Sequence, residues 1–307
     1  MAPSSNSTIE ERYPALKAQR PSLGRRPLLL LIADEFWSLD ARTWTALASI
    51  VADNPPGPQP PWAHDRDEHD VGEDSAAAPG VVVRTDYSTG SDEAWAAFCA
   101  ALRDAEHEFF ADQAPVGGNS GPDDGNGDIE MVAGPQPPAT ESSAADSDDD
   151  ASTDEEDEGE SSLFAPLSDA ARFDNISNLR ALRLLFDVSA RATPGSGQQH
   201  PADRGGGIQH RLSGLHGLQE TYDTRGRTLW IFDARSRADG CARLVSEAGD
   251  VATGDSWRAR ATHMAELQAG LAARALRIDF GGLDRWDYNE RRRNMLEADA
   301  GHAAVWS

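Results

Sequence analysis

The sequence predicts an α/β fold with a mainly parallel or mixed sheet and flanking helices, interrupted by a long acidic disordered insert. Short apolar runs that are typical of buried strands alternate with stretches in which apolar residues recur at helical spacing. Two such strand–helix units follow each other in the first half of the chain, as parallel strands joined by crossover helices require. Between residues 112 and 161 both patterns stop.

The two strand–helix units follow a polar leader, residues 1–26, whose prolines predict a flexible segment. The apolar run 27–33 predicts a buried strand, and the apolar spacing within 44–51 predicts a helix. The run 81–87 predicts a second strand, followed by a helix with Ser91 as its N-cap. In both units an Asp follows the apolar run, and a Trp is the first residue of the apolar helix face. This similarity can also arise by chance.

The insert, residues 112–161, carries most of the acidity of the chain. Two-thirds of the net charge of −24 comes from 16 Asp or Glu between residues 111 and 160, where no Lys or Arg occurs. Such a composition buries too little apolar surface to offset the entropy of the chain, so the insert is expected to be disordered.

Four hydroxyl residues of the insert are followed three positions later by an acidic residue, which is the pattern that acidophilic kinases prefer. These candidate phosphorylation sites are Ser143, Ser147, Ser152 and Thr153. The alternative is chance, because any Ser inside an acidic run satisfies the pattern.

The second half of the chain, residues 162–299, is expected to complete one domain with residues 27–111, leaving a tail at 300–307. The predicted strands cover residues 228–233, 241–245 and 275–280. The predicted helices begin after a cap at Ser177 or Asn178, at Trp257 after a cap at Asp255 or Ser256, and at about residue 284.

The cysteine content and the apolar runs favour an intracellular location, cytoplasmic or nuclear. Cys99 and Cys241 are the only cysteines, too few for the disulfide framework of a secreted domain. Residues 1–26 contain no secretory apolar core, and no apolar run reaches the ~20 residues of a membrane span. The acidic excess argues against nucleic acid as a partner, because phosphate binding needs clustered Lys or Arg.

Four predicted strands are followed by an aspartate, and these residues are candidate metal ligands. They are Asp34, Asp86, Asp233 and Asp279. Ligands of open α/β sheets bind outside the carboxyl ends of the strands, and carboxylates that converge there can hold Mg²⁺ for hydrolysis or phosphoryl transfer. The alternative is that each Asp caps the following helix or turn.

A second candidate site binds an anion. Arg258, Arg260 and His263 lie at the start of the predicted helix from Trp257, where the positive helix terminus favours negative charge. The alternative is a solvated helix face. The sequence contains no phosphate-binding loop, dinucleotide fingerprint, nucleophile elbow or zinc-protease motif.

The residues Arg-Thr-Asp-Tyr-Ser at 84–88, followed by Trp95, resemble the R-T-D-aromatic-S…W signature of a widespread domain family of unknown function. The second half of the chain resembles a family of uncharacterised fungal proteins. The stretches that carry this second resemblance are 174–185, 229–233, 253–260 and 278–288. The resemblance implies a eukaryotic intracellular protein without a known activity, so no catalytic residue is carried over.

Two functions from different classes remain open at this point. The first is a non-enzymatic interaction protein, which binds a protein partner through the phosphorylated acidic insert or through helix surfaces, with no membrane or nucleic acid involved. The second is a Mg²⁺-dependent hydrolase or phosphotransferase that uses the four aspartates. The sequence does not predict the oligomeric state.

Overall fold

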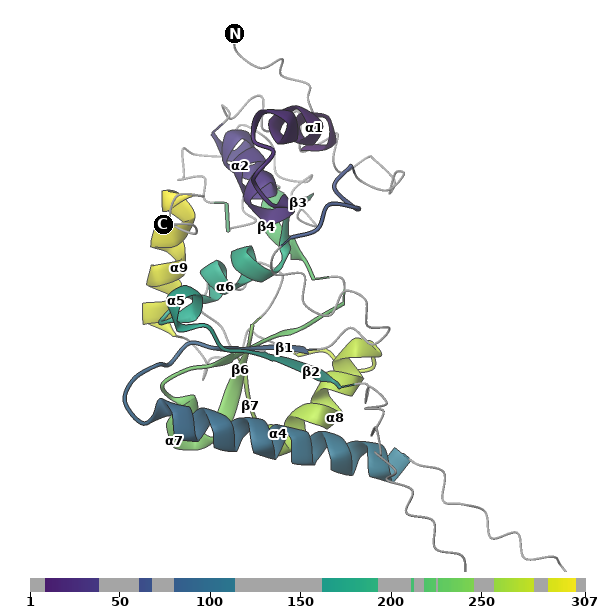
Figure 1. Cartoon of the computed structure of the whole chain (residues 1–307), viewed down its shortest axis with the longest axis vertical. Coiled ribbons are helices and arrows are strands. Elements are labelled where there is room, and N and C mark those ends of the chain that lie inside the picture. The colour runs from purple at the N-terminus through teal and green to yellow at the C-terminus, as the bar shows by residue number, and fades with distance from the viewer. Residues whose placement is uncertain are drawn as a thin grey trace, which may run out of the picture.

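The structure is a computed structural model, shown in Figure 1. It describes residues 9–38, 61–67, 80–113, 162–192, 211–212, 218–224, 226–245, 257–278 and 287–301. Within these ranges a five-stranded mixed sheet carries helices on both faces, and a two-stranded sheet lies above it (Figure 1). The predicted α/β class is confirmed.

The five-stranded sheet has the order β2-β1-β5-β6-β7. Its strands are β1 (Gly80–Arg84), β2 (Phe164–Leu167), β5 (Leu229–Phe232), β6 (Cys241–Val245) and β7 (Trp257–Arg260). β1 pairs in parallel with β2 on one side and β5 on the other. β6 is antiparallel to both β5 and β7. The parallel half of the sheet is therefore centred on β1.

Strand β1 is buried on both faces, which explains its uninterrupted valine run. Val81 and Val83 pack into one core and Val82 into the other, because successive side chains of a strand point to opposite faces. Leu229 and Trp230 of β5 divide in the same way. The sheet thus separates two hydrophobic cores.

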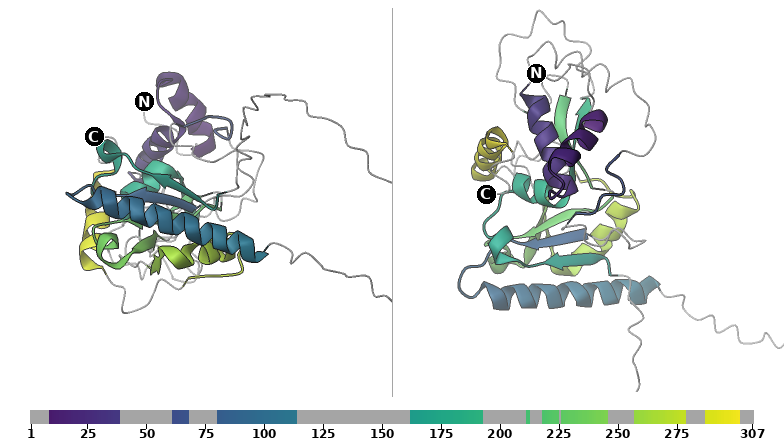
Figure 2. Two further views of the ribbon diagram at one scale, coloured as in Figure 1. Left: turned by 60° about the horizontal axis from the view of Figure 1, so that its bottom comes forward. Right: turned by 45° about the horizontal axis from the view of Figure 1, so that its top comes forward.

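Helices α4 (Ser91–Gln113) and α8 (Ala261–Ala272) cover one face of the sheet, and α4 runs below the sheet in Figure 1 and in the right view of Figure 2. The predicted helix after Ser91 is confirmed, with acidic residues in its first turn where they favour the helix dipole. Phe98 and Leu102 of α4 and Met264 of α8 are buried in the core on this side.

The opposite face carries the other core and a hairpin. Its elements are α1 (Ile9–Gln19), α2 (Arg25–Trp37), α5 (Ala170–Phe173), α6 (Asn178–Leu185), α9 (Tyr288–Ala300), β3 (Asp187–Ala192) and β4 (Leu218–Asp223). α6 lies against this face of the sheet, and α2 lies against the β3–β4 hairpin farther away (Figure 1). A short helix, α7 (Ser236–Asp239), follows β5.

Buried ion pairs join α2 and α6 to the hairpin. Arg25 of α2 bonds Asp187 of β3 at 2.9 Å, and Arg183 of α6 bonds Glu220 of β4 at 3.0 Å. Glu220 also accepts a hydrogen bond from Tyr222 at 2.6 Å. Removing one member of such a pair leaves an uncompensated buried charge, so these contacts fix the register of the hairpin against the helices.

The structure corrects the prediction for residues 27–33, which belong to helix α2 and not to a strand. Periodicity cannot distinguish a short buried strand from a helix that is buried almost all round. Eight residues of α2 are buried, including Arg25 and Arg26, so its apolar run has no polar face that would reveal the helix. Helix α1 with buried Tyr13 also lies where a flexible leader was expected.

Two further predictions in the second half are wrong. Residues 257–260 form strand β7, and helix α8 begins only at Ala261. Trp257 fits the apolar spacing of the helix, but pairing with β6 holds it in a strand. Residues 275–278 form no strand. The last predicted helix is confirmed as α9, and α6 begins after Ser177 as predicted.

Several predicted features lie outside the described residues. They are the helix at 44–51, residues 114–161 of the insert with Ser143, Ser147, Ser152 and Thr153, and Asp279. Helix α4 continues to Gln113, so Asp112 and Gln113 are helical.

Glu106 of α4 holds the point where the chain enters β2. One carboxylate oxygen of Glu106 accepts hydrogen bonds from the backbone N–H of Leu163 at 2.6 Å and of Phe164 at 3.1 Å, and from the hydroxyl of Ser162 at 3.0 Å. Burial raises the pKa of Glu106, although these hydrogen bonds act in the opposite direction. The junction lies at the amino-terminal ends of the parallel strands, because β2 starts there.

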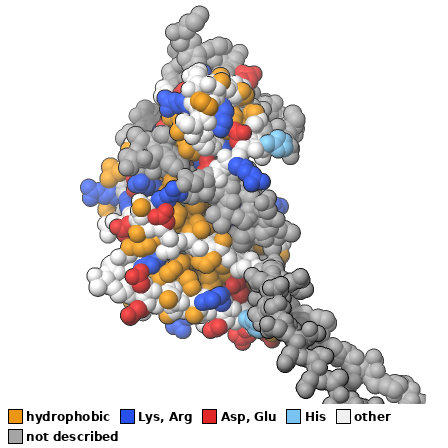
Figure 3. Space-filling view, in the orientation of Figure 1, with side chains coloured by type: hydrophobic (Ala, Val, Ile, Leu, Met, Phe, Trp, Pro, Cys, Tyr) orange, Lys and Arg blue, Asp and Glu red, His pale blue; other side chains and the backbone are white. Residues whose placement is uncertain are grey.

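The described surface mixes side chains of both charges. On the face seen in Figure 3, basic and acidic side chains are interspersed, and hydrophobic side chains gather at the level of the sheet. Among the described helices, none combines the length and the apolar composition that crossing a bilayer requires.

Candidate functional site

A pocket of about 1020 Å³ lies at the carboxyl ends of β1 and β5. Its walls are residues 85–88, 174–176, 233–235 and 287–289, with Arg243, Arg258 and Arg293. The connection that leaves β1 runs to α4 on one face of the sheet, and the connection that leaves β2 runs to α6 on the other (Figure 1). Crevices where neighbouring connections diverge in this way are the usual ligand sites of open α/β sheets.

Arg84 holds the loop between β1 and α4 in place. Its guanidinium donates to the backbone oxygen of Asp86 at 2.9 Å and to the hydroxyl of Ser91 at 2.7 Å, and it lies 4.4 Å from the ring centroid of Tyr87. The backbone N–H of Thr85 donates to the oxygen of Phe232 at the end of β5. These contacts hold the Arg-Thr-Asp-Tyr-Ser segment in a loop that lines the pocket.

Asp86 lines the pocket, and one of its two carboxylate oxygens lacks a hydrogen bond. Oδ1 accepts from the backbone N–H of Ser88 at 3.1 Å and from its hydroxyl at 2.6 Å. Oδ2 has no hydrogen-bond partner within the described parts of the chain, and the nearest cation, Arg237, lies 4.0 Å away. The side chain is only 6% exposed.

Asp86 is ionised in this setting. Burial opposes ionisation, but the two hydrogen bonds from Ser88 and the charges of Arg237 and Arg84 outweigh it, so the pKa of Asp86 lies below its ordinary value. The buried hydroxyl of Tyr87, which also lines the pocket, likewise has no hydrogen-bond partner among the residues described.

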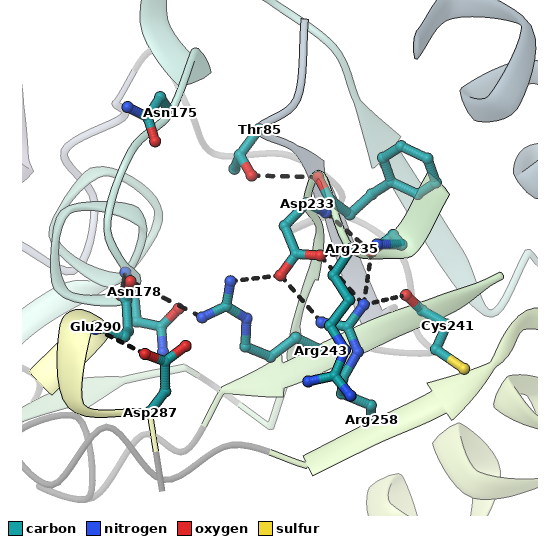
Figure 4. Close-up of polar contacts among 12 residues, drawn as sticks. Thr85, Asn175, Asn178, Asp233, Arg235, Cys241, Arg243, Arg258, Asp287 and Glu290 are labelled. Carbon is teal, nitrogen blue, oxygen red and sulfur yellow. Dashed lines mark hydrogen bonds and ion pairs between the residues drawn. The ribbon is translucent and has the colours of Figure 1, made fainter. Parts of the chain in front are cut away.

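Asp233, which follows β5, is saturated with donors (Figure 4). Arg258 bonds its two oxygens at 3.0 and 3.1 Å, and Arg243 bonds Oδ2 at 2.5 Å. The backbone N–H of Ser236 donates to Oδ1 at 2.9 Å. Burial works against ionisation, yet the two guanidinium groups and Ser236 prevail and lower the pKa of Asp233 to about 2.

Arg243 also reaches the α9 wall of the pocket. Its guanidinium lies 3.9 Å from the carboxylate of Glu290, which accepts a hydrogen bond from the backbone N–H of Asn178 at 2.6 Å (Figure 4). Burial raises the pKa of Glu290. The chain of contacts from Asp233 through Arg243 and Glu290 fixes α9 and the start of α6 relative to the sheet.

The structure brings together only two of the four aspartates predicted to bind a metal. Asp86 and Asp233 line the same pocket at the ends of adjacent parallel strands. Asp34 lies on helix α2, outside the set of pocket residues, and bonds Arg211 at 2.6 Å. Within the described ranges no group of three or more His, Cys, Asp or Glu is arranged to hold a metal ion. The predicted four-aspartate Mg²⁺ site is therefore not formed by the described residues.

The predicted anion site at Arg258, Arg260 and His263 is also divided. Arg258 lies on β7 and is bonded to Asp233 in the pocket, whereas Arg260 at the end of β7 and His263 on α8 are exposed. The expected helix terminus beside Arg258 does not exist, because residues 257–260 form a strand.

Several pocket residues carry no chemical signal in the sequence. Arg235, Arg243, Asn289 and Arg293 belong to no recognised motif, and they meet only because the strands and α9 converge. A weaker signal existed at residues 174–176 and at Tyr288, which fall in stretches that carry the stated resemblance. No family model, curated protein or solved structure matches the chain.

Proposed function

We propose that this chain is a ligand-binding protein that holds a small polar molecule in the pocket at the carboxyl ends of β1 and β5. The observation that carries the proposal is the oxygen Oδ2 of Asp86. Native structures leave few buried polar atoms unsatisfied, and an ionised acceptor without a donor costs about 1–3 kcal/mol or more. A hydroxyl, amine or N–H group of a ligand at this oxygen removes that cost.

The same contacts favour binding over Mg²⁺-dependent hydrolysis. A metal ion shared by Asp86 and Asp233 has to displace two guanidinium groups from Asp233, since both of its oxygens already accept hydrogen bonds from Arg258. Charge-assisted pairs of this kind are among the stronger protein hydrogen bonds. Asp233 therefore holds the two arginines in place, and Asp86 is the carboxylate that can accept a hydrogen bond from a ligand.

A thermal-shift screen of the purified full chain tests the proposal. The probes are neutral sugars, amino acids, dipeptides, nucleosides and MgCl₂, each against the wild type and the isosteric variant Asp86→Asn. We expect at least one organic probe to raise the Tm of the wild type and to lose this effect in the variant. Asp104→Asn, on the exposed side of α4, is the matched control. Stabilisation by MgCl₂ alone that depends on Asp86 argues for the metal function instead.

We also propose that the acidic insert binds a protein partner and is phosphorylated at Ser143, Ser147, Ser152 or Thr153. Support comes from its charge, 16 acidic and no basic residues between 111 and 160. An affinity pull-down with and without residues 112–161 tests the partner. Phosphoproteomics that finds no phosphate on any of the four residues counts against the proposed phosphorylation.

We place the protein in the cytoplasm or nucleus of a fungal cell. The two free cysteines, Cys99 and Cys241, and the resemblance to fungal sequences support this placement. Microscopy of a fluorescent fusion in a fungal host tests it, and secretion of the fusion into the medium contradicts it.

A further inference from the structure

The charges that line the pocket balance. Four aspartates and four arginines line it, with no Lys, Glu or His among the lining residues that the structure describes. Arg243 and Arg258 are bonded to Asp233, and Arg293 is paired with Glu290 and Glu297. The aspartates repel a polyanion and the arginines repel a polycation, so the charge of the lining favours neither kind of ligand. A neutral ligand that forms many hydrogen bonds fits this lining best.

An exposed aromatic ring stands at the pocket wall. Tyr288, in the first turn of α9, lines the pocket with 64% of its surface exposed. Tyrosine is enriched at recognition surfaces, because its ring offers apolar contact area and its hydroxyl a polar group. The face of a phenol ring carries partial negative charge, which attracts the C–H groups on the flat side of a sugar ring.

The remaining polar groups suit hydroxyl ligands. Oδ2 of Asp86 and the hydroxyl of Tyr87 have no hydrogen-bond partner among the described residues; the first can accept a hydrogen bond, and the second can donate or accept one. Asn175 and Asn289 line the same pocket, and their amide groups both donate and accept. A polyol offers hydroxyl groups that match acceptors, donors and amides alike.

From these features we infer that the pocket binds a carbohydrate, with a sugar ring packed on Tyr288 and one hydroxyl donating to Oδ2 of Asp86. The inference rests on the proposed binding function and names its ligand class. The volume of about 1020 Å³ is at the upper end of small-molecule sites, so the pocket has room for more than one sugar ring.

The test applies the full-length chain to a glycan array and then measures Kd by calorimetry with the best-bound oligosaccharide. Four variants are compared with the wild type: Asp86→Asn, Tyr288→Ala, Tyr288→Phe and the control Asp104→Asn. We expect Asp86→Asn to weaken binding about 10- to 100-fold through loss of a charge-assisted hydrogen bond. We expect Tyr288→Ala to weaken it about tenfold, while Tyr288→Phe keeps the stacking surface and binds within a few-fold of the wild type.

Adenosine and glycylglycine serve as comparison ligands in the same calorimeter. Asp86-dependent binding of either one, with no glycan bound, overturns the carbohydrate inference and leaves the proposed binding function standing. Glycan binding that neither Asp86→Asn nor Tyr288→Ala weakens places the sugar elsewhere and also overturns the inference. If no glycan, comparison ligand or screened probe shows Asp86-dependent binding, the proposed function fails as well.

Discussion

Arg243 and Arg258 lie directly opposite each other on the antiparallel strands β6 and β7, and both donate to the carboxylate of Asp233. Like charges at opposite positions of a strand pair destabilise a sheet. Here Asp233, which both guanidinium groups share, offsets their charges together with Glu290 beside Arg243 and Asp239 beside Arg258. Three neighbouring strands thus share one charge cluster.

Replacing Asp233 by Asn should therefore destabilise the protein in a pH-dependent way. The pKa of Asp233 falls from the ordinary 3.8 to about 2, which corresponds to about 2 kcal/mol. Because the folded-state pKa is lowered, this stability is present above pH 3.8 and is lost as the pH falls through about 2. Denaturant unfolding of wild type and variant at several pH values measures the difference. A difference that stays constant with pH contradicts the prediction.

Replacing Glu106 by Ala should cost about 2–3 kcal/mol of unfolding free energy, because two buried backbone N–H groups lose their acceptor. Glu106→Gln should cost clearly less, since its amide oxygen can accept the same bonds without a buried charge. The raised pKa adds a separate pH dependence: the stability that comes from protonation of Glu106 in the folded state is complete below the ordinary value of 4.5 and is lost as the pH rises through the folded-state value. The hydrogen bonds from Leu163 and Phe164 to the carboxylate remain at pH 7. Urea unfolding at pH 7 compares the variants, and an equal cost for both contradicts the assignment.

Glu290→Ala should loosen the start of α6. The backbone N–H of Asn178 then has no acceptor, which costs about 1–3 kcal/mol, and Arg243 loses a neighbouring carboxylate. Hydrogen exchange followed by mass spectrometry should show faster exchange at residues 178–180 and in the first turn of α9. Glu290→Gln retains an acceptor and is expected to protect residue 178. Unchanged exchange in the Ala variant contradicts this role for Glu290.

Arg84→Lys should destabilise the protein by about 2 kcal/mol although it keeps the charge, because lysine cannot form the same fork of hydrogen bonds and does not stack on Tyr87 in the same way. The control is Arg103→Lys at an exposed position of α4. Thermal unfolding measures both. We also expect a pocket ligand to bind Arg84→Lys more weakly, since Arg84 positions the loop that carries Asp86.

The sequence predicted the aspartates that follow β1 and β5 better than the residues that other elements contribute to the pocket. Strand-end aspartates are recognisable because a buried apolar run precedes them, and this rule found Asp86 and Asp233. It failed at Asp34, where the apolar run is a buried helix. Arg243 could not be found, because its contact with Asp233 depends on the antiparallel pairing of β5 and β6, which no local pattern reveals.

The fold class followed from alternation of strands and helices, and β1, α4, α6, β5, β6 and α9 lie where apolar periodicity and caps placed them. The errors arose where one pattern fits two structures. Residues 257–260 continue the apolar spacing of α8 and also alternate as a strand does, and only the partner strand β6 decides between them. Whether a helix or a strand forms at such positions depends on residues distant in the sequence.

Strand β1 joins the two parts of the chain that lie on either side of residues 114–161. Of the five strands in the described sheet, β1 alone comes from the part before residue 114, and it is hydrogen-bonded to β2 and β5 on its two edges. A protease that cleaves between 114 and 161 would produce two fragments that stay associated, since one fragment supplies an interior strand of the sheet, between β2 and β5 of the other fragment. Expressed separately, the two fragments become a complementation pair, in which assembly of the sheet reports that both pieces have met.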